Sequence, residues 1–191
     1  TRALPSGYQL SLLGVLIFLA GGVGDMIWHV IFGIEVSVEA LVSPTHLTLA
    51  LGGGLIVSGP LRSAWRRDDA QREGWLALGP MLLSVALLLS VLAFFTHLTH
   101  PLGRPWAAAG NRPTSVVFAL HAPDPPYVGG SIPSEAIAQI IGIASILLQA
   151  GLMIGVVLLL LRRWGSALPP GSLTLVFTVN ALFLVWMERK V

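Results

Sequence analysis

Cysteine is absent from this 191-residue chain, and charged residues are scarce. Without cysteine the chain can form no disulfide, no iron–sulfur cluster and no thiolate metal site, so a metal ion would have to be held by imidazole and carboxylate groups. Charged residues make up only 10% of the sequence, compared with about 25% in soluble domains. The formal net charge of +2 is too small, and the basic residues are too dispersed, for nucleic-acid binding.

The signature patterns of several enzyme classes are missing as well. The sequence has no phosphate-binding glycine loop, no His-Glu-x-x-His and no Gly-x-Ser-x-Gly. The sequence is strongly apolar: 54% of the residues are hydrophobic and the mean hydropathy is +0.81. The sequence therefore predicts an all-α protein, a polytopic transmembrane helix bundle with about five spanning helices. We expect one integral membrane domain over residues 1–191, and the lack of an initial Met is compatible with part of a longer chain.

Five apolar stretches are predicted to span the membrane. Ser43-Pro44 is typical of a helix start, as N-cap and first helical residue, and Gly33 is typical of a helix end. The positive-inside rule places the arginine-rich segment after the second stretch, and Arg162-Arg163 after the fourth, in the cytoplasm. The loops between stretches one and two and between three and four are then external. The five stretches are Tyr8–Ile34, Pro44–Leu61, Trp75–Phe95, Pro133–Leu161 and Ser172–Met187.

Polar residues gather between Gly24 and His46, and we expect them at the external ends of the helices and in the external loop. Asp25 and His29 are four residues apart, so a helix presents both on one face. With His46 from the first turn of the next helix they can form a three-ligand metal site with an open position. Two other interpretations stay open: a hydrogen-bonded pair beside a capping histidine, or a proton pathway. Glu35 and Glu39 are interpreted as a solvated face of the connecting segment.

A weaker second cluster follows the third stretch. His97 and His100 lie one turn apart if that helix continues, and Glu135 opens the fourth stretch on the same predicted side of the membrane. These three residues are a possible second metal site. The alternative is two interfacial histidines in contact with water and a carboxylate that interacts with the helix dipole.

The arrangement Asp25-x-x-Trp28-His29, followed by Ser43-Pro44-Thr45-His46 and a glycine-containing span, resembles the C subunit of the copper membrane monooxygenases, the particulate methane and ammonia monooxygenase family. In that family Asp-x-x-Trp-His and a later Pro-x-His supply ligands of a membrane copper site. The resemblance implies that Asp25, His29 and His46 are metal ligands. It covers roughly residues 10 to 65, and Glu135 stands where the family's second motif ends in histidine.

The resemblance also implies a function. Copper would activate dioxygen and insert one oxygen atom into a small apolar molecule that arrives through the bilayer, while zinc and iron suit the same ligands. The expected partners are the lipid bilayer, other membrane subunits and further copies of the chain, in the cytoplasmic membrane with the metal site on the external or periplasmic face. An ion or metal transporter and a non-catalytic structural subunit of a membrane complex are the alternatives.

Overall fold

The computed structural model describes residues 4–33, 43–67, 74–96 and 135–188. Every regular element in these ranges is helical, so the all-α prediction is confirmed for the described part of the chain. The elements are α1 (Gln9–Phe32), α3 (Pro44–Val57), α4 (Gly59–Trp65), α5 (Trp75–Thr96), α7 (Glu135–Trp164), the 3-10 turn η3 (Gly165–Ala167) and α8 (Ser172–Glu188).

The predicted boundaries around the polar stretch are confirmed. Helix α1 is followed by Gly33, whose φ of 81° lies in the region that favours glycine and stops the helix. Helix α3 starts with Ser43 as N-cap and Pro44 as its first residue, and the Ser43 side chain accepts a hydrogen bond from the backbone N–H of His46.

The second predicted stretch is not one uninterrupted helix. It divides at Ser58 into α3 and α4, because Pro60 has no backbone N–H to donate to the carbonyl four residues earlier. Side chains supply donors at the break: the Ser11 Oγ lies 3.3 Å from the Ile56 carbonyl oxygen, and the Arg62 Nη2 donates to the neighbouring Leu55 carbonyl oxygen at 2.9 Å. A proline-induced break is thus stabilised by polar groups from both neighbouring helices.

Three of the described helices have the length and apolar composition of membrane spans. They cover Gln9–Phe32, Trp75–Thr96 and Gln139–Ala167, and each contains an 18-residue window of high mean hydropathy, from 2.1 to 2.5. The apolar helices Pro44–Val57 and Ser172–Trp186 are shorter than a span. Composition and helix length thus indicate a membrane protein, and three helices of the described ranges are long and apolar enough to cross a bilayer.

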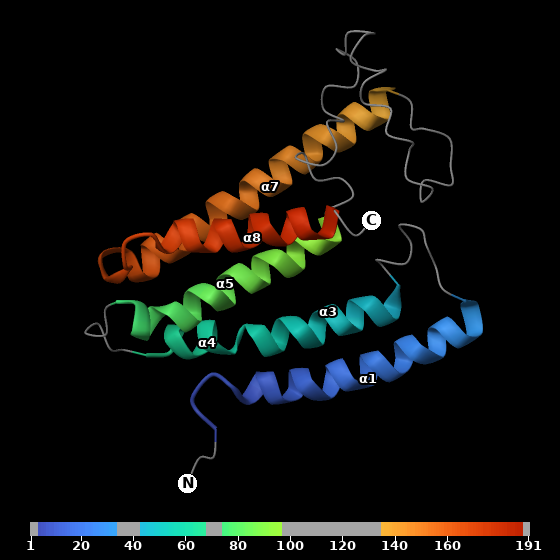
Figure 1. Cartoon of the computed structure of the whole chain (residues 1–191), viewed down its shortest axis with the longest axis horizontal. Coiled ribbons are helices and arrows are strands. Elements are labelled where there is room, and N and C mark those ends of the chain that lie inside the picture. Colours follow the sequence, from blue (N-terminus) through green and yellow to red (C-terminus); the bar gives the residue numbers. More distant parts are fainter. Residues whose placement is uncertain (1–3, 34–42, 68–73, 97–134, 189–191) are drawn as a thin grey trace.

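The long helices lie in successive layers with α5 near the centre (Figure 1). Helix α1 packs on α3, α3 and α4 pack on α5, and α5 packs on α8, while α7 diverges from the others toward its N-terminal end. The most deeply buried apolar side chains gather around α5: Met81, Leu82, Leu160 and Val176. The C-terminal ends of α1 and α5 and the N-terminal ends of α3 and α7 lie at the same end of the bundle (Figure 1).

Glycines allow α1 and α3 to approach each other to backbone contact. A Cβ atom on Gly52 of α3 would lie 2.6 Å from the backbone nitrogen of Phe18 on α1, and one on Gly14 would lie 2.8 Å from the carbonyl oxygen of Gly52. Gly21 continues the contact toward the end of α1, where its Cβ would meet the Leu49 nitrogen at 3.2 Å. This glycine seam (Gly14, Gly21 and Gly52) leads directly to the polar cluster and fixes the spacing of the two helices there.

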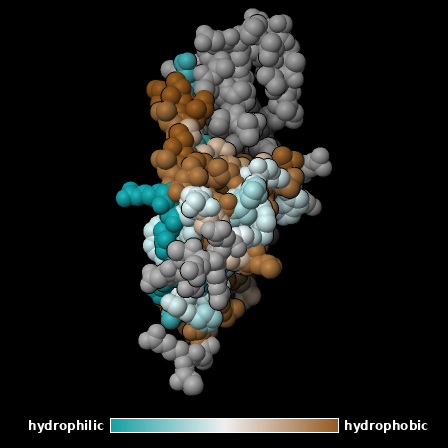
Figure 2. Space-filling view, turned by 90° about the vertical axis from the view of Figure 1, so that its left-hand side faces the viewer, coloured by the Kyte–Doolittle hydropathy of each residue, from teal (hydrophilic) through white to brown (hydrophobic). Residues whose placement is uncertain are grey.

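The opposite end of the bundle carries all the arginines of the described residues (Arg62, Arg66, Arg67, Arg162 and Arg163), and hydrophilic surface gathers there beside apolar surface (Figure 2). Arg163 of α7 donates to the carbonyl oxygens of Trp65 and Arg67 at the end of α4, at 3.2 and 3.1 Å. Its guanidinium group also lies 5.6 Å from the ring centroid of Trp164. Arginine and tryptophan at one end are typical of a membrane–water interface.

Candidate metal centre

The candidate metal centre consists of Asp25, His29 and His46, which the structure brings together. Each offers one ligand atom, and these atoms lie within 4.8 Å of one another. Asp25 and His29 lie in the last two turns of α1, and His46 lies in the first turn of α3, on helices rather than in the loop that joins them. The side chains are 20 to 29% exposed, so the cluster is partly shielded but accessible from outside.

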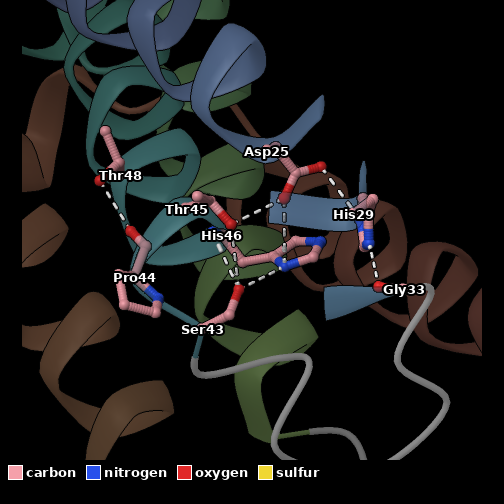
Figure 3. Close-up of polar contacts among 8 residues, drawn as sticks. All are labelled: Asp25, His29, Gly33, Ser43, Pro44, Thr45, His46 and Thr48. Carbon is pink, nitrogen blue, oxygen red and sulfur yellow. Dashed lines mark hydrogen bonds and ion pairs between the residues drawn. The ribbon is translucent and has the colours of Figure 1, made fainter. Parts of the chain in front are cut away.

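Asp25 is the centre of the cluster and contacts both imidazoles (Figure 3). Its Oδ2 lies 3.4 Å from Nε2 of His29, and its Oδ1 lies 3.7 Å from Nδ1 of His46. The two rings stand nearly edge to face, with their centroids 6.2 Å apart. A carboxylate between two imidazoles supplies the oxygen and nitrogen donors that copper, zinc and iron accept.

Hydrogen bonds from the surrounding backbone and side chains orient each of the three groups. The Nδ1 of His29 lies 3.1 Å from the carbonyl oxygen of Gly33, and the Nδ1 of His46 lies 2.8 Å from the Oγ of Ser43. The Thr45 hydroxyl donates to Oδ1 of Asp25 at 2.7 Å. Such outer hydrogen bonds fix the ring orientation of metal-binding histidines in other proteins, so the surroundings fit a metal ligand set.

The second predicted cluster is not assembled by the described residues. His97 and His100 lie outside them, as do Glu35 and Glu39 of the first loop. Glu135 is the first residue of α7. The structure therefore leaves the possible second site a prediction. Trp28, which belongs to the sequence motif, packs against Phe32 one turn later, with ring centroids 4.5 Å apart.

Two hydroxyl groups and one carbonyl group contact the three clustered residues in a way that the sequence does not predict. Thr45 was part of the motif, but only the folded arrangement of α1 against α3 shows that it reaches Asp25. The Ser43-Pro44 pair predicts that Ser43 is an N-cap, and its Oγ does accept from the backbone N–H of His46. Nothing in the sequence predicts the second contact of this Oγ, with Nδ1 of the His46 ring. The Gly33 carbonyl could not be predicted, because any residue has one.

Comparison of the chain with models of known protein families, with curated proteins and with solved structures finds no match. The class of site is therefore defined by its geometry alone: a two-histidine, one-carboxylate cluster on adjacent helix ends of a helical, apolar protein.

Proposed function

We propose that this chain is a membrane metal-binding protein that holds copper with Asp25, His29 and His46. The observation that carries the proposal is the convergence of their three ligand atoms within 4.8 Å, from two different helices. A carboxylate and two imidazoles also suit zinc and iron, and the resemblance of the motif to copper membrane monooxygenase C subunits favours copper.

The three protein ligands would leave further coordination positions open, as catalytic metal sites do. Copper bound there would supply dioxygen activation: one oxygen atom would enter a small apolar substrate and the other would leave as water, with two protons and two electrons from an external reductant. The role of the chain is to hold the ion, to orient its ligands and to place it at a helix end beside the lipid-facing surface of α1, where Val30 is 82% exposed. A substrate dissolved in the bilayer would reach the site along this apolar surface. Other membrane subunits or further copies of the chain are proposed to complete the enzyme.

The proposal includes five membrane crossings, with α3 and α4 together forming the second and α8 the fifth. A straight helix of α3's 14 residues is about 21 Å long and too short for a hydrocarbon core of about 30 Å, but Pro44–Trp65 as a whole reaches about 33 Å. Helix α8, at about 25 Å, is close to the required length. The arginine-rich end is then cytoplasmic and the metal centre external.

Metal analysis of the purified protein tests the proposal. Wild-type protein and the His29→Ala variant are expressed with copper, purified identically and analysed for copper, zinc and iron. We expect close to one copper per chain in the wild type and a large loss in the variant, because one of three ligands is removed. His121→Ala, which changes a histidine that is not a proposed ligand of either site, is the matched control. Equal copper content in wild type and His29→Ala would refute the proposal.

A structural role is the one competing function that a specific observation favours. Asp25 already binds Thr45 of α3 at 2.7 Å, so the cluster can join α1 to α3 without a metal ion. A non-catalytic subunit of this kind would be isolated stable and metal-free. The same metal analysis, combined with thermal unfolding in the presence of a chelator, distinguishes the two functions.

A further inference from the structure

We propose that Ser43 and Thr45 are positioning residues in a chain of hydrogen bonds in which each group donates to the next: His46 to Ser43, Ser43 to Thr45, and Thr45 to Asp25. This chain fixes which nitrogen of His46 is available to a metal ion. The inference rests on the proposed metal site for its functional meaning, but the chain itself is defined by contacts among four residues of one helix start and the facing helix (Figure 3).

The direction of the chain follows from counting hydrogens. Each hydroxyl carries one hydrogen, and the Thr45 hydroxyl donates its hydrogen to Oδ1 of Asp25, which can only accept. The Ser43 Oγ lies 3.2 Å from the Thr45 Oγ1, so in this contact Ser43 must be the donor. Ser43 then has no hydrogen left for Nδ1 of His46 at 2.8 Å, and that nitrogen must carry the hydrogen and donate to Ser43.

The tautomer of neutral His46 is therefore set by the chain. With the hydrogen on Nδ1, the lone pair lies on Nε2, and Nε2 is the ligand atom. The Nδ1 of His29 also carries a hydrogen, because it faces the carbonyl oxygen of Gly33 at 3.1 Å and a carbonyl can only accept. Neutral His29 therefore has its lone pair on Nε2, the nitrogen that lies 3.4 Å from Oδ2 of Asp25. Asp25 keeps Oδ2 for the ion, since Oδ1 accepts from Thr45. The site then offers two Nε2 atoms and one carboxylate oxygen.

Removal of the Thr45 hydroxyl should reverse the direction of the hydrogen bond between Ser43 and Nδ1 of His46. In Thr45→Val, Ser43 loses its acceptor, and its hydrogen becomes available to Nδ1 of His46. The His46 hydrogen then moves to Nε2, where it blocks the ligand position. Thr45→Ser keeps the hydroxyl. Thr48→Val is the matched control, because Thr48 belongs to the same helix and its hydroxyl donates at 2.7 Å to the carbonyl oxygen of Pro44, within the helix.

Nitrogen NMR of the metal-free protein tests the chain without reference to metal binding. Long-range proton–nitrogen spectra of the full chain labelled with ¹⁵N-histidine distinguish the two tautomers, with His46 assigned by its loss in His46→Ala. We expect the Nδ1–H tautomer for His46 in wild type, Thr45→Ser and Thr48→Val, and a shift toward Nε2–H in Thr45→Val. An Nε2–H tautomer in the wild type, or an unchanged Nδ1–H tautomer in Thr45→Val, would overturn the inference.

Titration with Cu²⁺, followed by electron paramagnetic resonance, tests the consequence for the site. Copper should bind about 10- to 100-fold more weakly to Thr45→Val than to wild type, as for lost outer hydrogen bonds in other metal sites, while Thr45→Ser and Thr48→Val remain close to wild type. Equal affinity and equal spectra of wild type and Thr45→Val would overturn the positioning role and leave the metal site intact. A wild type that binds no Cu²⁺ would instead overturn the proposed function. If the valine variant does not fold, Thr45→Ala removes the same hydroxyl.

Discussion

The glycine seam between α1 and α3 makes a quantitative prediction for Gly52→Ala. The added Cβ would lie 2.6 Å from the backbone nitrogen of Phe18 and 2.9 Å from the carbonyl oxygen of Gly14. Both are backbone atoms of α1, so no side chain can rotate away to make room. The two helices must move apart at this point.

The size of the effect follows from these distances. A contact of 2.6 Å must open to between 3.0 and 3.4 Å, which separates the backbones by about 0.4 to 0.8 Å. Overpacking of this kind costs about 1–3 kcal/mol. Gly54→Ala is the matched control: its Cβ meets nothing within 4 Å, and it receives the same gain in helix propensity, about 1 kcal/mol. Gly52→Ala should therefore be about 1–3 kcal/mol less stable than Gly54→Ala.

Thermal unfolding followed by circular dichroism in detergent measures this difference, and copper titration measures its effect on the site. Separation of α1 from α3 should lengthen the 2.7 Å contact between Thr45 and Asp25 and weaken copper binding in Gly52→Ala only. If Gly52→Ala unfolds at the same temperature as Gly54→Ala or above it, the close contact of the two helices is wrong.

Two further predictions concern the break between α3 and α4 and the proposed metal ion. Arg62→Ala removes hydrogen bonds to the carbonyl oxygens of Gly7 and Leu55 and should lower the free energy of unfolding by about 1.5–3 kcal/mol, measured by thermal unfolding. The control Arg66→Ala removes one 3.5 Å contact and should change it by less than about 0.5 kcal/mol, and equal effects of the two substitutions would contradict the role of Arg62. Saturating Cu²⁺ should raise the unfolding temperature of the wild-type protein, and a chelator should reverse the rise, because a ligand that binds the folded state stabilises it. Cu²⁺ should leave the unfolding temperature of His29→Ala unchanged, and an equal rise in this variant would contradict metal binding by His29.

Local sequence signals were enough to place most of the helices. Ser43-Pro44 and Gly33 act through the backbone of their own segment, so the start of α3 and the end of α1 could be predicted. The sequence pattern predicts one stretch across Ser58, because the residues on both sides are apolar, although Pro60 indicates a break in the helix there. The second and fifth membrane spans remain predictions, because the apolar helices Pro44–Val57 and Ser172–Trp186 are shorter than a membrane span.

The three residues of the candidate site could be predicted from the sequence, but the hydrogen bonds around them could not. Asp25 and His29 are four residues apart on one helix, and that spacing alone puts them on one face. The approach of α1 to α3 depends on contacts between segments, and the sequence indicates it only through glycines: the spacing of seven between Gly14 and Gly21, and the run Gly52-Gly53-Gly54 that allows close helix contact. The contact of Thr45 with Asp25 depends on that approach and could not be derived from either helix alone.

The pairing of α1 with α3 has a consequence for biosynthesis. All three proposed ligands lie within 22 residues, and the helices that carry them pack mainly on each other. N-terminal segments emerge first from the ribosome, and local contacts form sooner than distant ones. The ligand set can therefore be complete while α5, α7 and α8 are still being made, so an ion could be captured by a nascent helical hairpin before the rest of the bundle exists.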